Sequence, residues 1–393
     1  MLDIAKPRAA MQELGLSAWL LVNIFHRDEI ADLVLEVPAG RTNTRPWVCV
    51  LFPDKEPVKI IHRIEASILD HVPGKAHLYS TREEYTAALS RSLPRTGMVA
   101  ADFSQTIPVA SFLDHGTAMA AEACGCTLVS AESLIARCLG TLDAEGLRTH
   151  ADASAVLYSS IKDAWGLVKD RLGSTRPGRD TLHEGELRDL ISRRFSDAGL
   201  VSDGTPMVGA GAHSSDPHYS TPGDGAAVKA GDVIQFDIWA KKSTPGAVYA
   251  DISWVGIAAR EPTAEQQRAF DAITAAREEA ITVLSQGLSQ GKGVRGADVD
   301  AAARGKLVQL GYGDFLRHRT GHSIGSRVHG FGVNLDCVEF PDARLLPEGA
   351  CFSIEPGVYL PQFGMRTEID CVIRGGKLEV TGGDRQRSLL VLG

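Results

Sequence analysis

A chain of 393 residues is long enough to form two domains. Its 49 acidic residues outnumber its 41 lysines and arginines, giving a formal net charge of −8, which argues against a nucleic-acid-binding protein because such proteins need a basic face. The seven cysteines are scattered and form no CxxC pair, as is typical of a reducing compartment. The sequence contains no secretory signal and no apolar run long enough to span a membrane, so we expect a cytoplasmic protein.

The first 142 residues alternate short apolar runs with helical segments, which predicts a small α/β domain with a partly parallel sheet. Helices are expected at 5–15, at 82–93 with Thr81 as the N-cap, and at 109–123. The expected strands are short apolar runs bounded by turn residues, at 18–24, 46–52, 58–62, 97–102 and 127–130.

The loop at residues 38–45, PAGRTNTR, contains Pro, Gly, Asn and two arginines, Arg41 and Arg45. Such a composition is typical of a solvated hairpin tip. The alternative is a lid that carries a cation towards a neighbouring cleft. Both interpretations stay open at the level of the sequence.

Residues 143–393 predict a second domain of long helices and paired strands. Thr181 and Glu184 have the spacing of a capping box, which places the start of one helix at Thr181. The expected helices cover 143–172, 181–200, 262–286 and 296–310. The expected strands cover 206–210, 233–240, 249–257, 351–355, 367–374 and 377–381.

The second domain contains an internal repeat. The segment 231–237, which ends in Asp237, aligns with 349–355, which ends in Glu355; each is a glycine turn, an apolar strand and an acid. In each repeat a second acid follows within an apolar segment. Asp251 lies fourteen residues after Asp237, and Glu368 lies thirteen residues after Glu355. Burying a carboxylate is unfavourable unless it is paired or bound to a metal, so four acids at matching positions predict shared cations.

The stretch HRTGHSIGSRVH adds His318, His322 and His329 to these acids. Carboxylates with an imidazole suit Mn²⁺, Co²⁺, Fe²⁺ or Zn²⁺. Two such ions about 3.5 Å apart activate a shared water and polarise a carbonyl, which predicts amide hydrolysis without a protein nucleophile. Histidines beside such a site, including His218, either bind substrate and intermediate or have no role; for His213 we expect no role.

The sequence resembles the pita-bread (M24) metallopeptidases in several segments. These are HRTGHSIGSRVH, SIEPGVY and GMRTEID, together with the aspartates of QFDIWA and YADISW. Within this family they are similar to the Xaa-Pro peptidases, prolidase and aminopeptidase P. The resemblance covers residues 145–393 and implies an α+β pita-bread catalytic domain with a pseudo-twofold repeat. The segment before it resembles the creatinase/prolidase N-terminal α/β domain. The implied domains are therefore 1–142 and 143–393.

The resemblance also implies roles for individual residues. Asp237 would bind one metal ion, His322 and Glu355 the other, and Asp251 and Glu368 would bridge the two ions. Glu355 would also be the general base that takes a proton from the bridging water. The residues implied to contact substrate or intermediate, or to lie beside the metal centre, are His218, His329, His318, Tyr359 and Arg366.

This chain departs from the family pattern in two places. The hairpin between Asp237 and Asp251 is lengthened by residues 241–246. The family's usual Thr-Arg-Thr after the second aspartate is replaced by Ser253, Trp254 and Val255. The second departure leaves open what supports Asp251.

The resemblance implies a dinuclear exopeptidase that cleaves Xaa-Pro bonds, acting as a homodimer on small peptides with manganese, or with cobalt or zinc. We favour a Xaa-Pro dipeptidase, whose substrate has a free carboxylate that an arginine would bind; the candidates are Arg366, Arg41 and Arg45. The alternative is a Xaa-Pro aminopeptidase acting on longer peptides. An alternative of another class is a non-catalytic relative that binds peptides, but such relatives lose the five ligands present here.

Overall fold

The computed structural model describes residues 2–173 and 181–392. The chain divides into two compact units, Met1–Leu139 and Gly140–Gly393, whereas the resemblance implies a boundary after residue 142. In the part of the chain that the structure describes, no helix is both long and apolar enough to cross a membrane.

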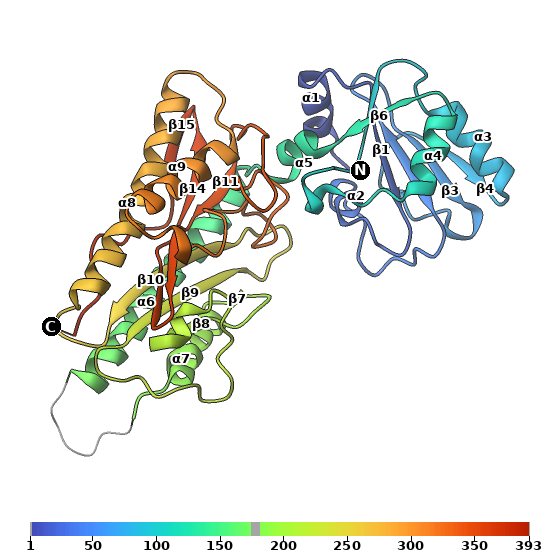
Figure 1. The fold of residues 1–393 in the computed structure, drawn as a ribbon. Coiled ribbons are helices and arrows are strands. Elements are labelled where there is room, and N and C mark those ends of the chain that lie inside the picture. The colour runs from blue at the N-terminus through green and yellow to red at the C-terminus, as the bar shows by residue number, and fades with distance from the viewer. Residues whose placement is uncertain (1, 174–180, 393) are drawn as a thin grey trace. The chain divides into compact units, whose positions relative to one another are not determined.

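The N-terminal unit is built on a six-stranded sheet with the order β4-β3-β2-β1-β5-β6 (Figure 1). The strands β1, β5 and β6 run parallel, while β2 runs antiparallel to β1 and β3, so the predicted partly parallel α/β domain is confirmed. All five residues of β2 are buried, which explains its continuous apolar sequence. The strands are β1 (Ala18–Asn23), β2 (Trp47–Leu51), β3 (Val58–His62), β4 (Lys75–Tyr79), β5 (Met98–Ala101) and β6 (Thr127–Ser130).

The helices of this unit begin at identifiable caps. Thr81 Oγ1 accepts a hydrogen bond from Glu84 N at 3.2 Å, which confirms Thr81 as the N-cap of α3. The helix expected at 109–123 was wrong at its start, because Asp114 accepts a hydrogen bond from Thr117 N and the helix begins only after it. Strand β4 and helices α2 and α5 were not expected. The helices are α1 (Ala5–Glu13), α2 (Glu29–Val34), α3 (Arg82–Ser92), α4 (His115–Ala123) and α5 (Glu132–Leu139).

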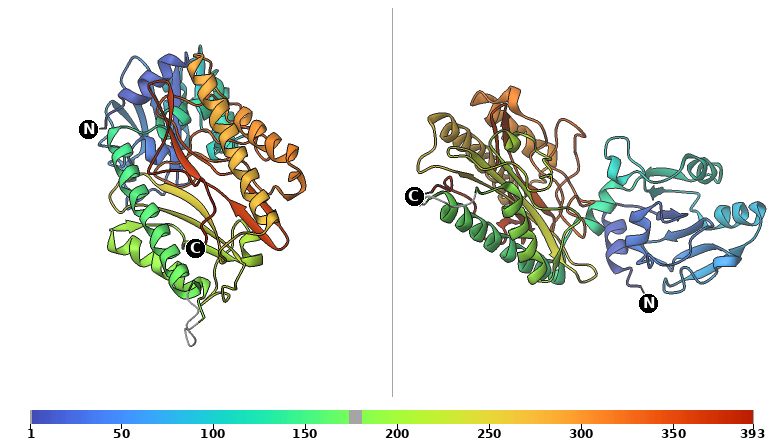
Figure 2. Two further views of the ribbon diagram at one scale, coloured as in Figure 1. Left: turned by 90° about the vertical axis from the view of Figure 1, so that its left-hand side faces the viewer. Right: turned by 90° about the horizontal axis from the view of Figure 1, so that it is seen from below.

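In each half of the C-terminal unit two helices precede a set of strands. The long helices α6 and α8 lie on the same side of these strands (Figures 1 and 2). Helix α6 packs on β9 and β10 through buried residues that include Leu157, Ile161 and Trp165. The first half comprises α6 (Ala144–Leu172), α7 (Glu184–Asp197), β7 (Leu200–Val201), β8 (Met207–Ala210), β9 (Val233–Lys242) and β10 (Ala250–Ile257). The second comprises α8 (Ala264–Ser289), α9 (Gly296–Gln309), β11 (Cys351–Ile354), β12 (Gly357–Leu360), β13 (Phe363–Arg366), β14 (Ile369–Arg374) and β15 (Lys377–Val380).

Helix α7 differs from its prediction at both ends. It begins at Glu184 and ends at Asp197, so Thr181 is not its N-cap. The backbone N–H of His183 donates instead to Glu186 Oε1 at 3.0 Å. Glu184 does not take part in a capping box, because its buried carboxylate bonds the backbone around the loop that follows β8.

The two halves match in architecture and differ in register. In the first half Asp237 pairs with Ser253, and Asp251 pairs with Trp239, so both acids lie within the β9–β10 ladder. In the second half Glu355 directly follows β11 and Glu368 directly precedes β14, so both acids lie at the end of the β11–β14 ladder. The hairpin of β12 and β13 fills the chain between them.

The seam between the halves runs along these acids. The N–H of Asp251 in β10 donates to Asp370 Oδ2 in β14 at 2.9 Å. The N–H of Glu368 donates to the carbonyl of Ser253 at 3.1 Å. The backbone N–H groups of these acids therefore make hydrogen bonds that connect the two halves.

Candidate active site

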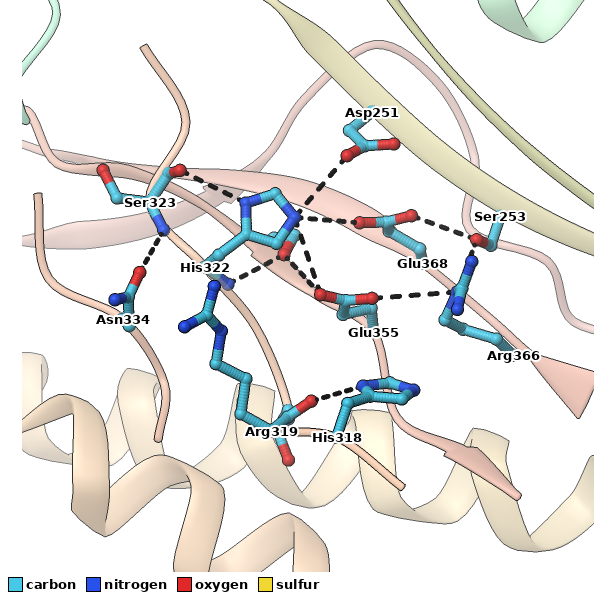
Figure 3. A network of polar contacts seen from close by, with 12 residues as sticks. Asp251, Ser253, His318, Arg319, His322, Ser323, Asn334, Glu355, Arg366 and Glu368 are labelled. Atoms are coloured by element: carbon cyan, nitrogen blue, oxygen red, sulfur yellow. Dashed lines mark hydrogen bonds and ion pairs between the residues drawn. The ribbon is translucent and has the colours of Figure 1, made fainter. Parts of the chain in front are cut away.

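The ring of His322 lies among acids from both halves of the C-terminal unit (Figure 3). Its Nε2 atom lies 3.5 Å from Asp251 Oδ2, 3.5 Å from Glu355 Oε1 and 3.9 Å from Glu368 Oε1. Its Nδ1 atom faces the carbonyl of Ser323 at 3.2 Å, so we assign the ring proton to Nδ1 and the lone pair to Nε2. A lone pair that faces carboxylates is unfavourable unless a cation or protons lie between them.

The donor atoms of this cluster fit a divalent metal ion. One ligand atom each from Asp251, His322 and Glu368 lie within 4.8 Å of one another. These residues are 5%, 3% and 2% exposed. Among the described residues no hydrogen-bond partner exists for Asp251 Oδ1 or Glu368 Oε1. Because a buried carboxylate oxygen without a partner is destabilising, a bound cation would relieve the strain of this arrangement.

Burial shifts the titration of the same residues. Burial and the neighbouring acids raise the pKa of Asp251 and of Glu368 well above the usual carboxyl range. Burial lowers the pKa of His322, so its ring is neutral around pH 7 and can act as a ligand. The metal-free cluster therefore holds protons that a metal ion would displace.

Asp237 borders the cluster, but its carboxylate is bonded to protein groups. Ser253 Oγ donates to Asp237 Oδ1 at 2.7 Å and lies 3.1 Å from Glu368 Oε2, and Arg366 Nη2 donates to Asp237 Oδ2. A carboxylate has about four lone-pair sites, so Asp237 keeps sites for an ion. Ser253, one of the residues that depart from the family pattern, therefore joins the acids of the two halves.

Arg366 connects several residues of the site through hydrogen bonds. Its Nε atom donates to Ser253 Oγ at 3.0 Å and its Nη1 atom to Tyr359 Oη at 3.0 Å, in addition to the bond with Asp237. The Tyr359 hydroxyl lies 2.7 Å from His318 Nε2, which extends the network to the HRTGH loop. The guanidinium of Arg366 is committed to these partners, so, against the expectation from the sequence, we do not assign it to a substrate carboxylate.

A cleft of about 870 Å³ opens over the cluster, and all of its lining residues belong to the C-terminal unit. His218, which is exposed, and His318 and His329 are among them. The ring of His329 meets that of His322 edge-on, with centroids 4.3 Å apart. Repulsion between the two imidazoles when both are protonated, together with burial, lowers the pKa of His329 to about 4, so His329 is neutral around pH 7. His213 lies outside this lining and bonds Glu184.

The loop at 38–45 belongs to the N-terminal unit. Arg41 and Arg45 are exposed, and Arg45 Nη1 donates to the carbonyl of Thr44 at 3.2 Å. The carboxylate of Glu65 accepts hydrogen bonds from the N–H groups of Thr44 and Arg45 and so fixes the end of the loop. The assignment of both arginines to substrate stays a prediction.

Two groups beside the cluster were not expected. Asp370 is buried behind Asp251, and burial raises its pKa well above the usual range. Arg319 lines the cleft next to His318, and no hydrogen bond or ion pair engages its guanidinium within the described residues. The sequence contained a signal for Asp370, because it follows Glu368 by two residues, and side chains two positions apart in an extended segment point to the same side.

The region that contains this cluster is similar to known proteins. Residues 152–375 match the model of metallopeptidase family M24. A Xaa-Pro dipeptidase from Lactobacillus delbrueckii subsp. lactis is 32% identical over 171 residues, which cover 42% of this chain and 40% of that protein. The alignment thus spans less than half of that relative's length.

Solved structures resemble the whole chain. The dipeptidase PepE from Mycobacterium ulcerans has a TM-score of 0.70 at 22% identity and covers 99% of this chain and 96% of its own. The X-Pro aminopeptidase from Thermotoga maritima has a TM-score of 0.61 at 19% identity, with 98% and 99% covered. These similarities confirm the predicted fold, an N-terminal α/β domain followed by a pita-bread domain. Together with the matched region, they show that the chain belongs to metallopeptidase family M24.

Proposed function

We propose that the protein is a dinuclear-metal exopeptidase that hydrolyses Xaa-Pro dipeptides. The observation that carries this proposal is the group of buried acids around His322 at the floor of a cleft. The similarity to a Xaa-Pro dipeptidase supports the choice of substrate. We further propose a cytoplasmic homodimer, as the resemblance implies.

The metal ligands in this proposal are the five residues Asp237, Asp251, His322, Glu355 and Glu368. Manganese is the ion we favour, with cobalt or zinc as alternatives, because carboxylate-rich sites accept all three. Bound divalent ions supply an activated water and a Lewis acid for the scissile carbonyl.

The other residues of the cleft bind and orient the peptide. Glu355 is the proposed general base, because its carboxylate borders both the cluster and the cleft. His218 and His329 are proposed to donate hydrogen bonds to the carbonyl oxygen as negative charge develops on it. His318, held by Tyr359, would form one wall of the proline pocket.

The free carboxylate of a dipeptide requires a cation that is not already engaged. Arg45 and Arg41 remain proposed as lid residues. Replacing Arg45 with alanine is expected to raise the KM for Xaa-Pro dipeptides about tenfold or more, because the substrate would lose about one charged hydrogen bond. Arg41→Ala is expected to have a smaller effect. Steady-state kinetics on both variants measure this. Unchanged KM values in both would exclude the lid.

Arg319 is the second candidate for the carboxylate, since its guanidinium faces the cleft without a partner in the described chain. Arg319→Ala should raise the KM for a dipeptide about tenfold while the KM for the amidated dipeptide changes little. Arg317→Ala is the matched control, because Arg317 also lines the cleft but bonds the carbonyl of Asp314. Equal effects on acid and amide would show that Arg319 does not bind the carboxylate.

The alternative, a Xaa-Pro aminopeptidase, is supported by the likeness to the Thermotoga maritima enzyme over the whole chain. Hydrolysis of a Xaa-Pro dipeptide and of a Xaa-Pro-Xaa tripeptide should be measured side by side, with Mn²⁺, Co²⁺ and Zn²⁺ added in turn. Preference for the dipeptide supports the proposal, and preference for the tripeptide supports the alternative. Hydrolysis of neither by metal-loaded protein would contradict both.

A further inference from the structure

The loop at residues 211–226 carries His218 into the cleft, yet it has little regular structure of its own. It contains one short 3₁₀ turn, Gly211–Ser215, and is otherwise irregular and rich in Gly and Ser. Residues 216–220 of the loop line the cleft. A side chain that must meet a reacting group needs a fixed position, so some other part of the unit has to hold this loop.

Glu184 provides that attachment at four points. Its side chain is fully buried at the first turn of α7. Oε1 accepts hydrogen bonds from Ala210 N at 2.7 Å and His213 Nδ1 at 2.9 Å. Oε2 accepts hydrogen bonds from Ala226 N at 2.8 Å and Tyr219 Oη at 2.9 Å. The donors come from both ends and from the middle of the loop.

The carboxylate of Glu184 packs closely against the loop. A Cβ atom added to Gly225 would lie 2.7 Å from Glu184 Oε2. The rings of His213 and Tyr219 stack with centroids 4.4 Å apart and planes at 27°. Burial and the carboxylate of Glu184 raise the pKa of Tyr219 to about 12, so its hydroxyl remains a donor. Tyr219 is the chain neighbour of His218, and its position fixes the backbone there.

The chemistry of the contact requires a carboxylate. Each oxygen of Glu184 faces one backbone N–H, from Ala210 or Ala226, and a backbone N–H can only donate. In a glutamine, an NH₂ group replaces one of these two oxygens. Because NH₂ is itself a donor, one of the two backbone N–H groups would lose its acceptor in either orientation of the amide. A buried carboxylate is stable only with such full satisfaction, which explains an acid at this position.

We propose that Glu184 is a positioning residue of the active site, which holds the loop 211–226 so that His218 faces the scissile bond. His213 has a role in this arrangement as one of the donors. The inference rests on the proposed peptidase function, in which His218 contacts the developing negative charge. Glu184 itself touches neither the proposed ligands nor the cleft.

The test is a double-mutant cycle on the metal-loaded full-length protein. Glu184→Gln is expected to lower kcat on a Xaa-Pro dipeptide about 10- to 100-fold, with KM and bound metal nearly unchanged. In a His218→Ala background the same substitution should change kcat less than about threefold, because its effect is transmitted through His218. Glu186→Gln, on the same helical turn, is the matched control and should retain activity.

Hydrogen exchange provides a readout that does not depend on activity. Peptides covering 211–226 should exchange faster in Glu184→Gln than in wild type, with the rest of the unit unchanged. Should that variant fail to fold, Tyr219→Phe, which removes one donor, should show a smaller loss of the same kind. Equal losses of kcat in both backgrounds, or unchanged exchange, would overturn the inference. A wild-type protein without peptidase activity would instead contradict the proposed function and leave the exchange result to decide the loop attachment.

Discussion

Glu368→Gln is expected to abolish catalysis and, at the same time, to stabilise the metal-free protein. Glu368 Oε1 lies 3.9 Å from His322 Nε2, and Glu368 forms with Asp251 and His322 a group of side chains that could hold a metal ion. An amide is a weak ligand and cannot carry the charge that offsets a divalent ion, so activity should fall about 10³-fold or more, which corresponds to about 4 kcal/mol of transition-state stabilisation. Peptide hydrolysis and metal content per chain measure this loss.

The gain in stability follows from burial. Glu368 is 2% exposed and its Oε1 atom has no partner within the described residues, while neighbouring acids repel its charge. A glutamine is neutral without having to bind a proton and can donate to a neighbouring carboxylate, so it avoids the cost of keeping Glu368 protonated or charged in this cluster. The substitution should therefore stabilise the metal-free protein by about 1–3 kcal/mol, or several degrees in Tm. Glu379→Gln, at a half-exposed carboxylate in β15, should change neither property. A destabilised metal-free variant would contradict this account of the site.

Removal of metal is expected to give the protein a stability that falls as the pH rises. Burial raises the pKa of Asp251, Glu368 and Asp370, so in the metal-free fold these carboxyls keep protons that the unfolded chain has already lost. Through these carboxyls the folded state binds more protons than the unfolded state, so their contribution to stability decreases from about pH 4 towards the raised pKa values. Each pKa unit contributes about 1.4 kcal/mol.

Thermal unfolding after treatment with a chelator tests this prediction. The Tm of metal-free protein should be several degrees higher at about pH 7 than at about pH 8.5. This window lies above the ordinary pKa of histidine, so His322 and His329, whose pKa values are lowered in the fold, are neutral in the folded and the unfolded chain alike. Metal-loaded protein should lack this fall, since the ions replace the protons as partners of the acids. In Glu368→Gln the slope should be shallower, because one of the shifted groups is gone. A metal-free Tm that is flat or rises with pH would contradict the raised pKa values.

Much of the fold was predictable because its signals are local. The alternation of apolar runs and helices in the first 140 residues predicted a partly parallel sheet, and Thr81 capped α3 as expected. The start of α7 was not predictable from spacing. Thr181 and Glu184 satisfy the capping pattern, but tertiary bonds to Ala210 and Ala226 take the carboxylate of Glu184 away from it.

The candidate site, too, was predictable from the sequence only in part. The apolar surroundings of Asp237, Asp251 and Glu368 indicated buried acids, since such acids are unfavourable without a cation. The sequence could not show that Ser253 links Asp237 to Arg366, because that contact depends on the register of two strands and on a residue 113 positions away. It also left Arg366 as a candidate for substrate, although its donors are engaged within the site.

The seam along the acids has a consequence for how the C-terminal unit opens. Asp237 and Asp251 belong to one half, and Glu355 and Glu368 belong to the other. An ion bound among them would cross-link the halves, so its binding free energy would oppose their separation. The halves could then separate only after the ion is released, so the loaded enzyme would open no faster than it loses its metal. Neither half, expressed alone, would hold more than a fragment of a ligand set.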